Sequence, residues 1–173
     1  MADCCASLGT IEKQCGGANA SGLKTKLYVA CKEDIDVIPG VNTDDQAGDL
    51  HTILTDITMK VDKVFHEFNI SKTGSTFVCE PEGEAEFITY NITLTVLIPK
   101  LNPAASAVLN GIIGGEYVVI FETRNDQKMI IGDLDEACTI APRPAIEDQN
   151  AYTLTININS NNIPYFYAGV VPV

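Results

Sequence analysis

Residues 86–99, EFITYNITLTVLIP, contain the alternation that decides the fold. From residue 88 to residue 98 every second side chain is apolar, and the positions between them are mostly threonine or asparagine. Strict alternation is typical of a β-strand with one buried and one exposed face. The side chains expected to face the core are Ile88, Tyr90, Ile92, Leu94, Val96 and Ile98.

A short helix and a hairpin are predicted directly after this strand. Asn102 and Pro103 supply an N-cap and a first helical residue. Apolar residues then recur at helical spacing: Ala105, Val108, Leu109, Ile112 and Ile113, before two glycines. Residues 116–124 (EYVVIFETR) and 128–134 (KMIIGDL) are strand-like, and residues 125–127 between them form a turn signal.

Further strand patterns place the chain among mainly β proteins. They are KTKLYVAC (24–31, with Leu27, Val29 and Cys31 on one face), ITMKV (57–61), KVFHEFNI (63–70, with Val64, His66, Phe68 and Ile70 on one face), STFVCE (75–80) and AYTLTININ (151–159, with Tyr152, Leu154, Ile156 and Ile158 on one face). We expect an antiparallel β-sandwich or flattened barrel of about seven or eight strands with one short flanking α-helix. Residues 1–22 are predicted to be an arm, and residues 23–173 a single assembly domain with a long loop at 32–55.

Charge and hydropathy exclude two classes of function. The chain has 23 acidic and 11 basic residues, a formal net charge of −12. A surface of that sign repels phosphate, so nucleic-acid recognition through a basic patch is not expected. We also predict neither a secretory signal nor a membrane span, because residues 1–10 have no basic leader and no run of 18 apolar residues occurs.

The six cysteines do not have the CxxC spacing that zinc sites use. Cys31 and Cys79 lie in strand patterns, and we expect both to be buried as small apolar residues. Cys4, Cys5 and Cys15 lie in the Gly/Ala/Ser-rich arm, where a disulfide or a bound metal is the alternative to free thiols.

Signals for catalysis are weak. His51 and His66 have no cysteine or serine partner in the sequence, so we expect them to be solvated or half-buried. Asp133, Asp135 and Glu136 offer oxygen ligands for a hard cation, but they lack the full series of a calcium loop and favour a solvated turn. No nucleophile, phosphate-binding or zinc-protease motif is present, so the prediction is a non-enzymatic protein without a cofactor.

The segment EPEGEAE (80–86) has the most unusual charge pattern. Its glutamates, Glu80, Glu82, Glu84 and Glu86, recur at every second position and would share one face of an extended chain. One interpretation is a soluble hairpin tip, since a proline and a glycine lie within the segment. The other is an acidic lining that keeps DNA from adhering to a channel wall.

Three passages resemble a known family: ISKTGSTFVCEPEGEAEFITYNITLTVLIPKL (70–101), NPAASAVLNGIIGGEYVVIFETRNDQKMIIGDLDEA (102–137) and DQNAYTLTININSNNIPYFYAG (148–169). Residues 23–170 resemble tail-tube-like structural proteins of tailed bacteriophages, especially those of Bacteroidetes-infecting and crAss-like phages. The resemblance lies in the order of elements, in the helix between strands and in the passage "strand, RND turn, strand, Ile-Gly-Asp".

The resemblance implies a β-sandwich or barrel whose copies close into rings around a DNA channel. It implies a virion location in the tail after assembly in the bacterial cytoplasm, with other tail or neck proteins as partners and no membrane. A long early loop would reach the adjacent subunit or ring. The matching segment here runs from Glu33 to Thr55 and carries Asp44, Asp45 and Asp49. Separately from the resemblance, we hypothesise that the arm is held by neighbouring subunits, because a Gly-rich segment needs a partner to become ordered. The cysteines of the arm have no counterpart in this pattern, which leaves a tube subunit, ring, hub or connector open.

Two other classes fit parts of the sequence. A secreted carbohydrate-binding or adhesin-type β-sandwich also has threonine-rich strands, but such modules usually expose tryptophans and this chain has none. An enzyme is the least favoured class, because no nucleophile and base are paired in the sequence.

Overall fold

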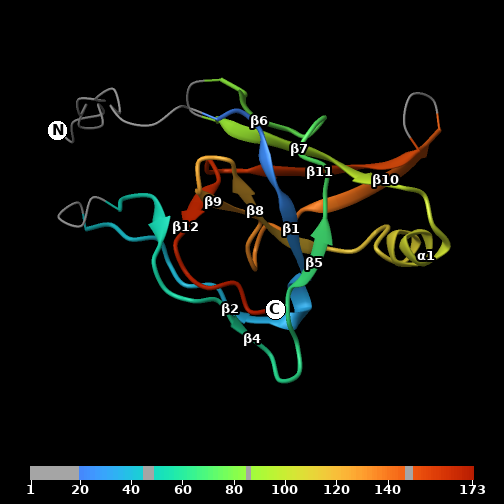
Figure 1. Ribbon diagram of the computed structural model, residues 1–173. Helices are drawn as coiled ribbons and strands as arrows, with labels where there is room; N and C mark the ends of the chain where they lie inside the picture. Colours follow the sequence, from blue (N-terminus) through green and yellow to red (C-terminus); the bar gives the residue numbers. More distant parts are fainter. Residues whose placement is uncertain (1–19, 45–48, 85–86, 147–149) are drawn as a thin grey trace.

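The computed structural model describes residues 20–44, 49–84, 87–146 and 150–173. Two β-sheets pack face to face, and a single α-helix lies at one end of them (Figure 1). The elements are β1 (Leu23–Cys31), η1 (Lys32–Asp34), β2 (Ile35–Val37), β3 (Thr52–Ile53), β4 (Thr58–Met59), β5 (His66–Asn69), β6 (Thr76–Glu82), β7 (Thr89–Pro99), α1 (Pro103–Gly111), β8 (Tyr117–Thr123), β9 (Lys128–Ile131), β10 (Thr139–Ala145), β11 (Ala151–Ser160) and β12 (Tyr165–Tyr167).

The larger sheet has the order β3-β12-β9-β8-β1-β5, and the smaller has the order β10-β11-β7-β6. All neighbours in them pair antiparallel except β12 and β3, and β2 and β4 form a separate antiparallel pair. The predicted mainly β, sandwich-like class with one flanking helix is confirmed. The described residues form twelve strands, more than the about seven or eight expected from patterns, because short strands of two to four residues have too few positions to show a period.

The main core lies between the two sheets. In β7, Ile92, Leu94 and Val96 are at most 2% exposed, as the alternation predicted. In β11 the same pattern buries Tyr152, Leu154, Ile156 and Ile158. Ile88 is the exception, because it precedes β7 and is 45% exposed. The long strand and its partner therefore form the centre of the smaller sheet, paired over ten residues.

Strand β8 is buried on both faces. Val119 and Phe121 point into the main core, whereas Val118 and Ile120 belong to a second apolar cluster on the opposite face of the larger sheet. A strand covered on both sides is expected to be continuously apolar, which explains the unbroken run YVVIF.

The described residues between 35 and 65 and the C-terminal segment supply side chains that cover that second face. Ile35, Ile53 and Phe65 are at most 3% exposed and pack with Tyr167 in the second cluster. The expectation that residues 32–55 form a loop is therefore wrong at Ile35 and Ile53, which are core residues in β2 and β3.

The predicted face of residues 63–70 is also wrong in its first half. Val64 is 42% exposed, whereas Phe65 is 2% exposed and its backbone N–H donates to the Pro172 carbonyl at 2.8 Å. Phe65 packs onto the second cluster before β5 begins at His66, so the alternation does not run through this point.

Helix α1 begins where its cap was predicted. The Asn102 side chain accepts a hydrogen bond from the Ala105 N–H at 2.7 Å, and Pro103 occupies the first turn. Leu109 is buried, but Val108 is 53% exposed. The helix ends at Gly111, so Ile112 and the residues after it lie outside it. The Tyr152 hydroxyl donates to the Asn102 carbonyl at 3.1 Å and fastens the helix to β11.

The β8–β9 hairpin is confirmed. The Thr123 N–H donates to the Gln127 carbonyl at 2.8 Å, and Asp126 adopts the left-handed φ of 62°. The Lys24 ammonium of β1 bridges Asp126 and Glu122, and these two carboxylates raise the pKa of Lys24. The turn is thereby fixed to the start of β1.

Candidate assembly surface

The pairing register brings side chains of similar chemistry together on the exposed face of the smaller sheet. Because side chains alternate along each strand, burying the apolar set leaves threonine and asparagine outside. We call this surface the Thr/Asn face. It comprises Thr139, Ala141 and Arg143 of β10, Thr153, Thr155, Asn157 and Asn159 of β11, Thr89, Asn91, Thr93, Thr95 and Leu97 of β7, and Thr76, Val78, Glu80 and Glu82 of β6.

Side chains of the Thr/Asn face stand in rows across the strands. Thr93 lies opposite Asn157, and the Thr93 hydroxyl donates to the Asn157 side-chain oxygen at 3.0 Å. Within this face Arg143 is the one cationic side chain, and the two glutamates of β6 are the anionic ones. The surface is therefore polar but nearly uncharged, with its acids at one edge.

The predicted row of four glutamates is only partly present. Glu80 and Glu82 are exposed and project from the Thr/Asn face opposite Asn91 and Thr89. The strand ends at Glu82, Gly83 takes a φ of 115°, and the Glu84 carbonyl accepts from the Phe87 N–H at 2.7 Å. Glu84 thus lies in the turn and does not continue the row, and Glu86 lies outside the described residues.

The two edges of the smaller sheet differ. Edge strand β10 contains Pro142 and Pro144, which pair in register with Leu154 and Tyr152 of β11. The two prolines are two residues apart, so both backbone nitrogens point away from β11, and neither carries a hydrogen to donate. This edge therefore cannot form a regular ladder of hydrogen bonds with another strand. Edge strand β6 has Pro81 near its end and none from Thr76 to Glu80.

The acidic loop between β2 and β3 is closed at its base. The Asn42 N–H donates to the Thr52 carbonyl at 2.8 Å, and the Asn42 side chain accepts from the Asp44 N–H at 3.1 Å. Asp44 and Asp49 are both exposed, as is Leu50. Asp45 lies outside the described residues. In the described part of the loop, Asp44, Asp49 and Leu50 are therefore presented to solvent.

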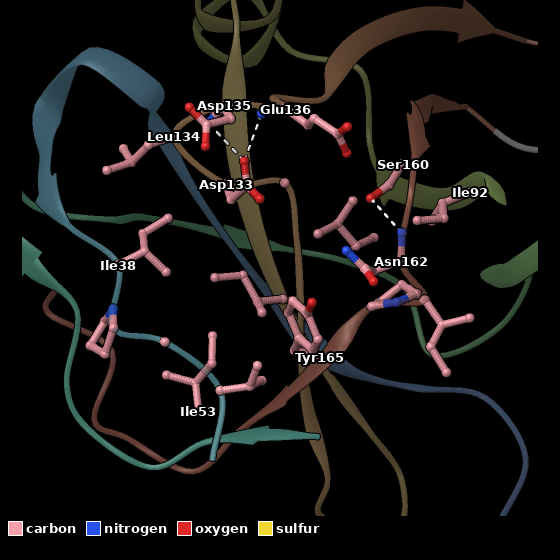
Figure 2. A pocket seen from close by; sticks show the side chains of 18 residues that line it. Ile38, Ile53, Ile92, Asp133, Leu134, Asp135, Glu136, Ser160, Asn162 and Tyr165 are labelled. Atoms are coloured by element: carbon pink, nitrogen blue, oxygen red, sulfur yellow. Dashed lines mark hydrogen bonds between the residues drawn. The ribbon is translucent and has the colours of Figure 1, made fainter. Parts of the chain in front are cut away.

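A pocket of about 340 Å³ lies between this loop and the end of β9 (Figure 2). Ile38, Ile53 and Tyr165 form its apolar side, and the acidic turn after β9 forms another part of its wall. In that turn one carboxylate oxygen of Asp133 accepts from the N–H groups of Asp135 and Glu136, at 2.7 and 2.6 Å. Asp133 and Asp135 are both exposed, so the turn is solvated, as the sequence favoured. No group of three or more potential metal ligands occurs in the described part of the chain.

The cysteines behave differently from expectation. Cys31 is exposed, because it is the last residue of β1 where the chain turns into η1, and Cys79 is half-buried beside the main core. The buried thiol is that of Cys138, where burial raises the pKa to about 12. Cys4, Cys5 and Cys15 lie outside the described residues.

Both histidines have the surroundings that were predicted. His66 is exposed on β5, and His51 is half-buried with its ring centroid 4.6 Å from that of Tyr165. His51 packs against the ring of Tyr165 as an aromatic side chain.

Helix α1, nine residues long, is too short to cross a bilayer, and no other helix in the described ranges is long and apolar enough to do so. The chain matches no protein-family model, no curated protein and no solved structure.

Sequence patterns identified the part of the Thr/Asn face that β7 contributes, together with Glu80 and Glu82 of β6. The polar positions of β7 were singled out from its alternation, and those of β11 could have been found in the same way from AYTLTININS. The contribution of β10 was missed, because the prolines in TIAPRPA argue against a strand unless that strand is known to lie at an edge.

Proposed function

We propose that this protein is a non-enzymatic structural component of a phage tail, a tube, ring, hub or connector subunit, whose copies form a homo-oligomeric ring around the DNA channel. The Thr/Asn face carries this proposal. It would line the channel, with Glu80 and Glu82 at one margin and with other tail or neck proteins adjoining the ring. In this reading the protein belongs to the virion and assembles in the bacterial cytoplasm.

The chemistry of the Thr/Asn face suits DNA that passes without binding. Adhesion of DNA to protein depends on Lys and Arg contacts that release counterions from phosphate. This face has one arginine and two glutamates among threonines and asparagines. Hydroxyl and amide groups keep the wall hydrated, and the glutamates repel phosphate within a Debye length of about 8 Å at physiological salt.

Contacts between copies are expected at loops and exposed apolar side chains rather than through one continuous sheet. The prolines of β10 oppose a regular ladder from β10 to the β6 strand of a neighbour. The loop carrying Asp44, Asp45 and Asp49 is a candidate for such contacts, because Leu50 and Leu54 beside it are 51% and 43% exposed. Scattered exposed leucines are common, but a contact between copies would bury them.

Charge reversal on the Thr/Asn face tests the proposal. In assembled particles, the double variant Glu80→Lys, Glu82→Lys should fold and assemble but slow DNA ejection, since lysines in the channel bind phosphate. The matched control is Glu33→Lys, Asp36→Lys, which makes the same change of net charge at exposed residues of η1 and β2. Equal ejection rates for both variants, or slowing by the control alone, would count against a channel-lining role.

A further inference from the structure

An apolar groove of about 660 Å³ runs beside the free edge of β6. Phe77 of β6 and Phe121 of β8 line it with ring centroids 5.1 Å apart, and Met129 and Phe166 line the part that belongs to the larger sheet. Among the described residues, β6 has a sheet neighbour on one side, β7. Backbone donors and acceptors on its other side therefore face the groove, which is the arrangement that accepts an added strand.

The described chain begins at this groove. Ala20 and Gly22 both line it. The Ala20 N–H donates to the Asn125 side-chain oxygen at 2.9 Å, and the Arg124 N–H donates to the Gly22 carbonyl at 3.1 Å. These bonds hold the start of the described chain against the β8–β9 turn, so residues 1–19 precede a point fixed at the rim of the groove.

The preceding residues have the composition and reach to fill it. Residues 4–11, CCASLGTI, contain no charged side chain and include Leu8 and Ile11. The eight residues from 12 to 19 can span up to about 28 Å, which exceeds the roughly 10 Å between Ser75 and Val78 along β6. Gly16 and Gly17 allow the chain to reverse between the groove rim and this segment.

We propose that residues 4–11 dock in this groove of their own chain and add a strand to the free edge of β6. The same chain is the source because a tether fixed at the rim gives the segment an effective concentration in the millimolar range, above that of a second copy in dilute solution. Docking would cover Phe77, Met129 and Phe166 and would supply hydrogen-bond partners to β6. The proposal differs from the expectation that the arm contacts neighbouring subunits, and it holds whether or not the protein forms a ring.

Disulfide trapping in the full-length chain tests the docking. Gln127→Cys introduces a thiol at an exposed position that lines the groove. Thr139→Cys, the control, introduces one at an exposed position on β10, the edge of the smaller sheet opposite β6. After mild oxidation, peptide mapping of the monomer band should show linkage of position 127 to Cys4 or Cys5 in roughly tenfold higher yield than linkage of position 139.

Equal yields at the two positions, or no linkage at position 127, would overturn the proposal. Linkage found only in species of twice the chain mass would overturn the assignment to the same chain. Hydrogen exchange provides a second test: Leu8→Asp should speed exchange of the β6 amides from Thr76 to Val78, whereas Glu12→Gln should not. Unchanged β6 exchange in the Leu8→Asp protein would contradict added-strand pairing.

Discussion

Cys138 joins the two sheets at one point of the main core. It has no exposed surface, its backbone pairs with that of Tyr117, and its thiol donates to the Tyr117 carbonyl at 3.0 Å. Desolvation of the thiolate is the main cause that raises its pKa from 9.0 to about 12. Because the folded protein holds the Cys138 thiol neutral at pH values where the unfolded chain ionises it, the free energy of unfolding depends on pH.

The stability contributed by Cys138 should fall as the pH rises from about 9 to about 12. Below the pKa that the Cys138 thiol has in the unfolded chain, the thiol is protonated in both the folded and the unfolded protein. Above that pKa the thiol of the unfolded chain loses its proton first, which lowers the free energy of unfolding by about 1.4 kcal/mol per pH unit. Denaturant unfolding of the wild-type and Cys138→Ala proteins at pH 8 and pH 10.5 measures how much unfolding free energy each protein loses between the two pH values. The wild-type protein should lose more stability than the variant; equal losses would show that this thiol is not the linked group.

The N-cap of helix α1 was predicted correctly from the sequence. Asn102→Ala removes the bond to the Ala105 N–H and should lower the free energy of unfolding by about 1 kcal/mol. Asn110→Ala is the control, since Asn110 is an exposed residue within the same helix. Thermal unfolding should separate the two variants. A loss in the control as large as that in Asn102→Ala would mean that capping is not the cause.

The prolines of β10 should keep that edge from pairing. Pro142→Thr with Pro144→Thr restores two outward N–H donors on an edge strand. We expect this double variant to self-associate at lower protein concentration than the wild-type chain, as measured by sedimentation velocity. Arg143→Thr, which changes the side chain between them but no backbone donor, should behave like the wild-type protein. Association by Arg143→Thr alone would point to charge rather than backbone pairing.

Sequence patterns predicted elements that are long and covered on one face. Strands β7 and β11 are of this kind, and their inward side chains were identified correctly. The second apolar cluster was not predicted, because Ile35, Ile53 and Phe65 are separated by polar loops and become neighbours only when the larger sheet presents its other face. Likewise, the Thr/Asn face needed the register of β10 and β11, which no local pattern contains.

At the scale of the whole molecule, the larger sheet is covered on both faces and the smaller sheet on one. Buried side chains lie on both sides of β8, whereas the outer face of the smaller sheet remains polar and open. Among the described residues, the outer face of the smaller sheet, the edge strand β10 with its two prolines, and the acidic side chains Asp44 and Asp49 are therefore open to contact with other molecules. Ring formation with the Thr/Asn face turned inward is the arrangement we propose for these surfaces.

The mass of the purified protein in native mass spectrometry, with particle images of the same sample, tests ring formation most directly. We predict a closed homo-oligomer, sixfold by the family resemblance or twelvefold for a neck position. Deletion of residues 44–49 should shift the protein toward monomers without changing its unfolding temperature. If only monomers are detected at high protein concentration, both without and with tail partners, the proposed function would be contradicted.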